Sequence, residues 1–207
     1  LRELAGRDLS GRALVLCMKG LEAETGLRIT EIVAQELGPI PCAIWVGPGH
    51  VQDFLRGVPN CMVIDSADAA LREALVRAFS SDLIRFYYGD DLIGNEIGAA
   101  AKNVVGIAAG MLDGYGLTSL KGALMARGTR EVGRLIGALG GSERSAYGLA
   151  HLGDYEATVF SPYSHNRAFG ERFVRGERYA QLAEGMATAK ALRVLSTRCG
   201  VGLPICG

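Results

Sequence analysis

The chain has 207 residues, with 22 lysines and arginines balanced by 22 aspartates and glutamates, so its net charge is zero. This balance gives no reason to expect general affinity for nucleic acid or for acidic membranes. Hydrophobic residues make up 49% of the chain and charged residues 21%, which excludes a disordered protein and is typical of a folded, soluble one. The 29 glycines are about twice the usual share of ~7% and indicate close approach of backbone segments or of a ligand.

Cysteine and histidine patterns exclude two further classes of protein. The five cysteines are scattered and form no CxxC pair, so we expect reduced core thiols in a cytoplasmic protein: Cys17, Cys42, Cys61, Cys199 and Cys206. No metal site is expected, because no HxxxH or HxH pair links the three histidines: His50, His151 and His165. Polar residues interrupt the longest apolar helical stretch, so we expect no segment that spans a membrane.

Short β-rich runs alternate with helix-like stretches in the first part of the chain. The patterns predict strands at 12–19, 41–47, 60–66 and 84–89. Helices are predicted between them, at 26–38, 50–57 and 67–81. Buried strands that alternate with helices indicate an α/β sheet that is at least partly parallel.

Only helical patterns follow from residue 90 onward. The predicted helices are 90–112, 119–139, 165–176 and 178–199. The sequence therefore predicts an α/β part over residues 1–89 and an all-α part over residues 90–207. Three or four strands are few for a sheet that should be covered on both faces, so we expect this chain to be a piece of a longer protein.

Lys102 stands in "GNEIGAAAKNVVGIAAGMLDG", an otherwise mostly apolar stretch at residues 94–114. No acid lies three or four residues away on its helical face, where glutamate or aspartate would normally pair with it. Burial of an unpaired ammonium is unfavourable, so three interpretations remain open. The side chain reaches water, or an acid from another helix pairs with it, or its pKa is lowered and it donates a proton near neutral pH.

Two further polar spots follow predicted strands, where α/β sheets bind ligands. Lys19 in "CMKGLEAETG" ends the first strand, and "VGPGH" (46–50) follows the second. Glycines in the latter would let a ligand approach the backbone. The alternatives are a solvated loop lysine and a tight turn.

The last polar spot is "GDYEATVFSPYSHNRAFG" at residues 153–170. It places Asp154 in a turn, and Ser164 can cap a helix that begins with His165, Asn166 and Arg167. Free N–H groups at a helix start, beside asparagine and a cation, favour a phosphate or carboxylate. A plain capped helix is the alternative.

Six segments resemble, in the same order and over nearly the whole chain, the soluble NAD(P)-dependent glycerol-3-phosphate dehydrogenases. They are "KGLEAETG", "GPGH", "NEIGAAAKNVVGIAAGMLDGYG", "ARGTREVGRLIGALGG", "GLAHLGDYEAT" and "SHNRAFG". The resemblance implies part of a Rossmann-type sheet followed by a helical domain like the C-terminal domain of 6-phosphogluconate dehydrogenase. It also implies NAD or NADP as cofactor and the reduction of dihydroxyacetone phosphate to glycerol 3-phosphate, and its reversal, by hydride transfer.

The resemblance implies a role for individual residues as well. Lys102 matches the catalytic lysine that donates a proton to the carbonyl oxygen, Lys19 matches the second active-site lysine, and Asp154 matches the aspartate that positions substrate and lysine. The implied substrate-binding residues are Gly47, Gly49, Thr158, Ser164, His165, Asn166 and Arg167. The implied cofactor-binding residues are Val51, His165, Leu182 and Glu184. The Gly/Ala-rich helices also favour a homodimer packed through helices.

Three features depart from the family. No GxGxxG occurs in these residues, although the family carries one at its first strand to hold the pyrophosphate, and the closing helices are also missing. His165 stands where the family usually has arginine, and Gly49 stands where it has a small hydroxyl residue. Two alternatives therefore stay open: a related dehydrogenase acting on another small phosphorylated or acidic carbonyl compound, and a truncated non-catalytic relative that serves as a binding module.

Overall fold

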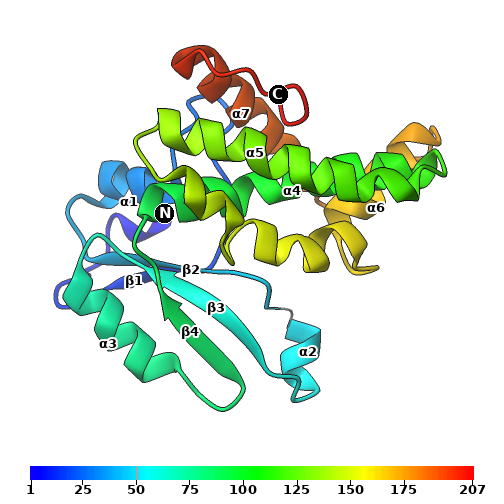
Figure 1. Ribbon diagram of the computed structural model, residues 1–207. Coiled ribbons are helices and arrows are strands. Elements are labelled where there is room, and N and C mark those ends of the chain that lie inside the picture. Colours follow the sequence, from blue (N-terminus) through cyan, green and yellow to red (C-terminus); the bar gives the residue numbers. More distant parts are fainter. Residues whose placement is uncertain (50) are drawn as a thin grey trace.

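The computed structural model describes residues 1–49 and 51–207 (Figure 1). His50, the last residue of the predicted 46–50 loop, lies outside the described residues.

A four-stranded sheet in the order β1-β2-β3-β4 forms the first part of the chain (Figure 1). The pairs β1/β2 and β3/β4 are parallel and the central pair β2/β3 is antiparallel, so the prediction of a partly parallel sheet is confirmed. The strands are β1 (Leu14–Leu16), β2 (Cys42–Val46), β3 (Asn60–Asp65) and β4 (Ile84–Tyr88). The first strand is shorter than its apolar run predicts, because the chain leaves the sheet before Lys19.

The two faces of the sheet carry alternate residues of each strand, as the two-residue period of a strand requires. One face packs Ala43, Met62 and Phe86 against α3 (Ala69–Phe79), whose N-terminus Asp68 caps. The opposite face turns Ile44, Val46 and Val63 toward α1 (Ile29–Leu37) and the helical part of the chain. Both faces of the sheet are thus partly covered within this chain, while most of β4 stays exposed.

The helical part is built around α4 (Leu92–Gly114), which is buried along most of its length (Figure 1). The other main helices are α5 (Lys121–Ala138), α6 (His165–Val174) and α7 (Gly185–Cys199), with the short α2 (Val51–Leu55) in the first part. Single turns are η1 (Arg2–Leu4), η2 (Thr118–Leu120), η3 (Glu143–Tyr147), η4 (Leu152–Asp154) and η5 (Glu156–Phe160), the last a π turn. Among the described residues, no helix combines the length and the apolar character needed to cross a bilayer.

Glycines bring α4 and α6 into backbone contact. A Cβ atom added to Gly110 would lie 1.9 Å from the carbonyl oxygen of Arg167, and one added to Gly170 would lie 2.0 Å from that of Ile107. The expectation that the glycines permit close helix packing is confirmed at this crossing.

Two expectations about local structure are wrong. Residues 178–184 are not helical, and α7 begins only at Gly185, whose N–H donates to the Asn166 side chain 2.9 Å away. Most of these residues are exposed, so no buried face favours a helix there. All five cysteines are free thiols, but Cys17 is exposed and does not belong to the core.

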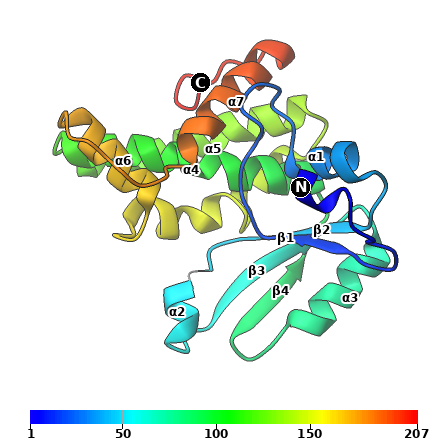
Figure 2. The ribbon, with the colours of Figure 1, turned by 180° about the vertical axis from the view of Figure 1, so that it is seen from behind.

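The loop that follows β1 leaves the sheet and packs into the helical part (Figure 2). Leu21 is buried in the same core cluster as Leu195 of α7, and a Cβ added to Gly26 would lie 2.8 Å from the Leu195 side chain. The Arg198 guanidinium donates to the Thr25 carbonyl oxygen at 3.3 Å. The loop that carries Lys19 is therefore held by α7 as well as by the sheet.

Glu96 of α4 makes a second connection between the two parts. Its carboxylate accepts from Arg28 at 2.7 Å and from the Thr30 backbone N–H at 3.0 Å, at the start of α1. Burial raises the pKa of Glu96, while the bonds from Thr30 and Arg28 oppose that rise. These contacts hold the start of α1 next to α4.

Candidate active site

Lys102 lies in the buried middle of α4 and pairs with an acid that is distant in sequence. Its Nζ is 2.9 Å from Oδ2 of Asp154 and donates to the Thr158 hydroxyl at 2.7 Å. Asp154 ends η4 and is 1% exposed, and Thr158 in turn donates to the Asp154 carbonyl oxygen at 2.8 Å. Of the three interpretations of Lys102, the exit to water is wrong, and the predicted approach of Asp154 is confirmed.

Lys19 binds the same carboxylate from the other side. Its Nζ lies 2.5 Å from Oδ2 of Asp154 and 3.1 Å from the Gly47 carbonyl oxygen, at the end of β2. The side chains of Lys19, Lys102 and Asp154 are 19%, 9% and 2% exposed. Two ammonium groups thus share one carboxylate in a largely buried place, which leaves one positive charge uncompensated when both lysines are protonated.

Burial lowers the pKa of Lys102 from its ordinary value of 10.5 to about 8. The Asp154 carboxylate opposes this shift by favouring the charged amine, and the neighbouring Lys19 ammonium adds to it. The amine can therefore exchange a proton near neutral pH, which the third interpretation of the sequence required.

A cavity of about 280 Å³ opens beside Lys102. Its lining joins most of the predicted site residues: Lys102, Thr158, Ser164, His165, Asn166, Leu182 and Glu184. Asn103 and Ala157, which are not among the predicted residues, complete the lining. Asn103 directly follows Lys102 in sequence, and Ala157 directly precedes Thr158. Their proximity to these predicted residues could have indicated them.

The start of α6 forms one wall of this cavity. Ser164 caps the helix by accepting the Arg167 N–H at 3.3 Å, as predicted, and Asn166 turns its amide oxygen toward Gly185. His165 is exposed, and its Nδ1 lies 2.8 Å from the Tyr179 hydroxyl. The Tyr179 hydroxyl donates to Gln181 at 3.1 Å, so Nδ1 of His165 is the donor to Tyr179 and Nε2 remains for other partners.

Arg167, which the resemblance implies to be a substrate-binding residue, is engaged in ion pairs outside this cavity. Its guanidinium binds Asp113 at 2.9 Å, Glu171 at 3.0 Å and the Ser161 carbonyl oxygen at 3.2 Å, and it does not line the cavity. Asp113 also binds Lys121 at 2.6 Å. A cation with two carboxylate partners is already neutralised, so it joins α4 to α6 rather than serving a ligand.

The loop after β2 also differs from expectation. A Cβ added to Gly49 would lie 2.6 Å from the Phe54 ring and 2.8 Å from the Met62 sulfur, so the ends of these two side chains pack against this glycine. Val51 is exposed at the start of α2, and neither residue lines the cavity beside Lys102. Gly47 takes part through its carbonyl oxygen, which accepts from Lys19.

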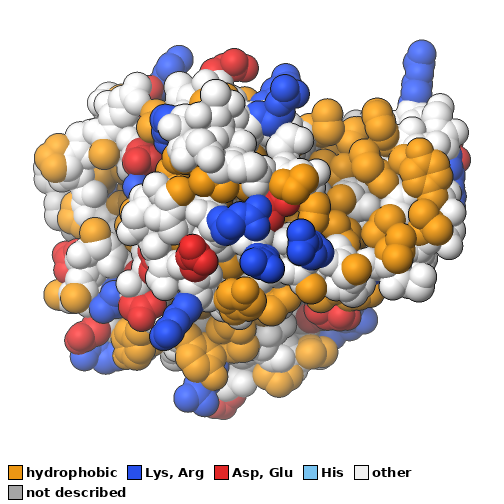
Figure 3. Space-filling model, turned by 45° about the horizontal axis from the view of Figure 1, so that its top comes forward, with side chains coloured by type: hydrophobic (Ala, Val, Ile, Leu, Met, Phe, Trp, Pro, Cys, Tyr) orange, Lys and Arg blue, Asp and Glu red, His pale blue; other side chains and the backbone are white. Residues whose placement is uncertain are grey.

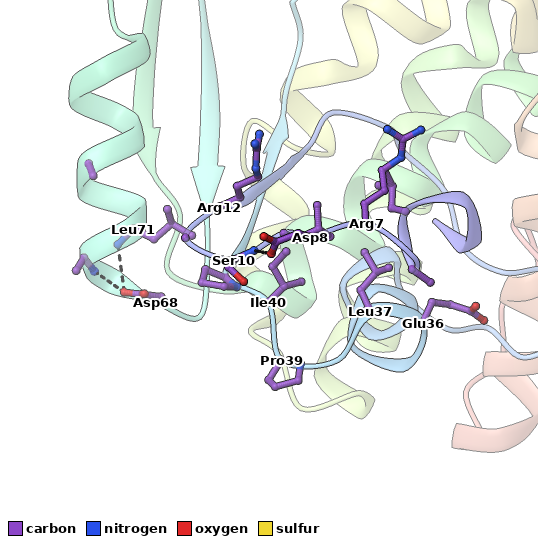
Figure 4. A pocket seen from close by; sticks show the side chains of 18 residues that line it. Arg7, Asp8, Ser10, Arg12, Glu36, Leu37, Pro39, Ile40, Asp68 and Leu71 are labelled. Carbon is purple, nitrogen blue, oxygen red and sulfur yellow. Dashed lines mark hydrogen bonds between the residues drawn. The ribbon is translucent and has the colours of Figure 1, made fainter.

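A larger cavity, of about 840 Å³, lies outside the predicted site (Figure 4). The start of the chain, the end of α1 and the start of α3 line it, with Arg7, Asp8 and Arg12 among the labelled side chains. Asp68 on its wall is occupied in capping α3. Lys102 is absent from this lining but lines the smaller cavity, so the smaller cavity is the better candidate. Within residues 1–49 and 51–207, no group of three or more His, Cys, Asp or Glu residues could hold a metal ion.

Comparison with known proteins identifies the family to which the chain belongs. The family model for the C-terminal domain of NAD-dependent glycerol-3-phosphate dehydrogenase matches residues 91–207, and that for its N-terminal domain matches residues 2–72. The chain belongs to the NAD-dependent glycerol-3-phosphate dehydrogenase family. The resemblance and the fold class inferred from the sequence are thereby confirmed.

Individual relatives agree with this assignment. Glycerol-3-phosphate dehydrogenase [NAD(P)+] of Cereibacter sphaeroides is 41% identical over 99% of this chain and 68% of its own length. The protein of that name from Deinococcus radiodurans is 42% identical over 93% of this chain and 59% of its own length. A crystal structure of glycerol-3-phosphate dehydrogenase from Coxiella burnetii superposes with a TM-score of 0.91 at 28% identity, covering 99% of this chain and 65% of that one. The chain thus spans roughly 60 to 70% of the length of these relatives.

Proposed function

We propose that this chain is the catalytic portion of a cytoplasmic glycerol-3-phosphate dehydrogenase that uses NAD or NADP. The reaction interconverts dihydroxyacetone phosphate and glycerol 3-phosphate. The observation that carries the proposal is the single Asp154 carboxylate held between Lys102 and Lys19 beside a small cavity. Membership of the dehydrogenase family, with relatives of that name covering the chain, supports the same activity.

Lys102 serves as the proton donor in this proposal. Asp154 and Thr158 take up two of the three N–H groups of its ammonium, and the third remains for a carbonyl oxygen in the cavity. As the substrate carbon accepts hydride, its oxygen takes the proton from Nζ of Lys102. In the reverse direction the neutral amine removes that proton, which a pKa of about 8 allows near neutral pH.

The substrate phosphate is proposed to lie against the start of α6. Ser164 already accepts the Arg167 N–H, while His165 and Asn166 face the cavity beside the free N–H groups of the first turn. Since Arg167 is engaged with Asp113 and Glu171, the cationic contact falls to His165, in contrast to the arrangement expected from sequence.

The residues of this chain fit one end of a nicotinamide cofactor. A cavity of about 280 Å³ suits a three-carbon phosphate and part of a ring, because sites for larger ligands usually exceed ~300 Å³. Leu182 would offer its exposed apolar side chain to the ring, and Glu184 a carboxylate. When bound, the cofactor supplies the hydride. No GxGxxG occurs here to hold its pyrophosphate, so we assign no residue to that group.

The test is oxidation of NADH or NADPH by the purified chain with dihydroxyacetone phosphate. Turnover that is lost in Lys102→Met and retained in Lys190→Met, a change of an exposed lysine on α7, would support the proposal. Binding of the substrate without turnover would favour the binding-module alternative instead. Preference for another phosphorylated or acidic carbonyl compound would favour the related-dehydrogenase alternative.

A homodimer is proposed through the apolar end of the helical part. Hydrophobic side chains gather at one end of the face in Figure 3. Tyr115, Leu117 and Leu120 at the α4–α5 connection and Phe173 of α6 are exposed apolar residues. Exposed apolar groups of this kind mark interaction surfaces when they are contiguous. Light scattering of the purified chain at several concentrations measures the mass, and a monomer throughout would exclude the dimer.

A further inference from the structure

A buried histidine lies beside the lysine–aspartate pair and has no role in the proposed proton transfer. His151 is 0% exposed, with Nδ1 2.8 Å from the Gly98 carbonyl oxygen and Nε2 2.7 Å from the Tyr155 hydroxyl. A carbonyl oxygen only accepts, so Nδ1 carries the proton and Nε2 accepts from Tyr155. Both ring nitrogens are therefore satisfied within the protein.

The bonds of His151 join the two segments that carry the candidate active site. Gly98 lies one helical turn before Lys102, and its carbonyl oxygen is the α-helical acceptor for the Lys102 N–H. On the other side, the Asp154 N–H donates to the His151 carbonyl oxygen at 3.0 Å. The histidine thus connects the turn of α4 below Lys102 to the η4 turn that ends in Asp154.

Close contacts with Gly98 and Tyr155 fix the position of His151. A Cβ added to Gly98 would lie 2.9 Å from the Cβ of His151, so the bare helix backbone is what lets the histidine lie on α4. Tyr155 is also 0% exposed, and a Cβ added to Gly128 of α5 would lie 3.4 Å from its hydroxyl. Tyr155 therefore holds the imidazole from the side of α5.

The imidazole keeps one hydrogen-bonding pattern over the pH range in which Lys102 titrates. The pKa of His151 is lowered to about 4, mainly by burial and in part by Lys102, while the bond to Gly98 and the charge of Asp154 oppose the shift. Beyond Tyr155 lie Glu131 and Cys206, whose interactions with the tyrosine raise its pKa along with burial. The ring is thus a neutral, fixed donor.

We propose that His151 is a positioning residue that holds Asp154 next to Lys102, and that the hydroxyl of Tyr155 fixes the orientation of the imidazole. Without the bond from Nδ1 to Gly98, the 151–158 segment loses its attachment to α4 at the turn below Lys102. The carboxylate would then no longer be held at 2.9 Å from the amine. The consequence for turnover rests on the proposed function, whereas the consequence for the titration of Lys102 does not.

The first test measures that titration without any enzyme assay. The full chain has four lysines (Lys19, Lys102, Lys121 and Lys190), so NMR of ¹³C-labelled lysine side chains resolves Lys102, with Lys102→Met as the assignment control. His151→Leu removes the donor at similar volume, and His151→Asn keeps an N–H near Nδ1. We expect the midpoint to fall by about half a pH unit or more in His151→Leu, because burial persists while the carboxylate is no longer held, and to stay near wild type in His151→Asn. An unchanged or raised midpoint in His151→Leu overturns the proposal.

The second test is a double-mutant cycle on turnover. His151→Leu should lower kcat about tenfold or more with little change in KM, since the cavity residues of α6 are untouched. In an Asp154→Asn background the same change should have little further effect on kcat, because a residue that acts only through the Asp154 carboxylate has no effect once that carboxylate is absent. Additive losses overturn the proposal.

Two outcomes of these experiments separate the inference from the proposed function. If the wild-type chain shows no turnover, the proposed function fails and the NMR titration alone decides about His151. If His151→Leu does not fold by circular dichroism, Tyr155→Phe takes its place, because it removes only the hydroxyl that donates to Nε2. A fall of the Lys102 midpoint in Tyr155→Phe supports the proposal, and an unchanged midpoint overturns it.

Discussion

Replacing Lys102 with methionine should remove a pH-dependent part of the free energy of unfolding. The pKa of Lys102 is lowered from 10.5 to about 8 in the folded chain. Below pH 8 the amine is protonated in both states, and between these two values only the unfolded chain keeps the proton. Because stability rises with pH wherever the unfolded state binds more protons, the free energy of unfolding of the wild type should increase through this window.

The size of the effect follows from the shift. At ~1.4 kcal/mol for each unit of pKa, the full rise attributable to Lys102 is about 3 kcal/mol. Methionine has no proton to release, so the variant lacks this rise. Below pH 8 we expect the variant to be within about 1 kcal/mol of wild type or more stable, because Asp154 keeps Lys19 as its partner at 2.5 Å and no uncompensated charge remains.

Urea unfolding followed by circular dichroism, from neutral pH to above pH 10.5, measures this difference. Tyrosines and the other lysines titrate in both proteins, so only the difference between wild type and variant is informative. Lys190→Met, at an exposed position of α7, is the matched control and should retain the rise. A difference that stays constant with pH would refute the reasoning, since Lys102 would then titrate alike in the folded and unfolded chain.

Three further outcomes follow from the same site. Lys102→Met should lower turnover by at least ~10², the contribution typical of a general acid, and turnover within tenfold of wild type would exclude that role. Asp154→Ala leaves two lysines without their carboxylate and should lower the free energy of unfolding by ~3–5 kcal/mol, so a loss below ~1 kcal/mol in urea unfolding would contradict the burial of the pair. His165→Arg should lower the KM for dihydroxyacetone phosphate at pH 8, because arginine stays charged and can donate two N–H groups to the phosphate. An unchanged KM at pH 8 would show that His165 does not bind the phosphate.

Local sequence patterns predict most of the fold because each element has its own periodicity. The strands alternate between two buried faces, and α4 is apolar all round because other elements surround it. The predicted helix does not form over residues 178–184, because this segment lacks the buried face that stabilises the other helices. Alanine, leucine and glutamate there favour a helix, but the segment buries almost nothing, and the contact between Asn166 and Gly185 decides where α7 begins.

Local sequence patterns predict the candidate site less well than they predict the fold. The absence of an acid near Lys102 indicates an unusual lysine, but only the resemblance to the family indicated Asp154 as its partner. Arg167 shows the limit of local reasoning: its position at the start of α6 favours an anion, yet Asp113, 54 residues away, takes its charge. No local pattern assigns these contacts to His151, Tyr155 and Tyr179, because each bond joins residues whose approach depends on the folded chain.

The packing of the Lys19 loop explains how residues from both parts of the chain can form one site. Lys19 follows a strand of the sheet, but the next residues are anchored in the helical part through Leu21 and Gly26. Glu96 of α4 holds the end of the same loop through Arg28. Lys19, Lys102 and Asp154 are therefore held by segments that pack on α4 or α7, so a substrate would meet an assembled proton donor.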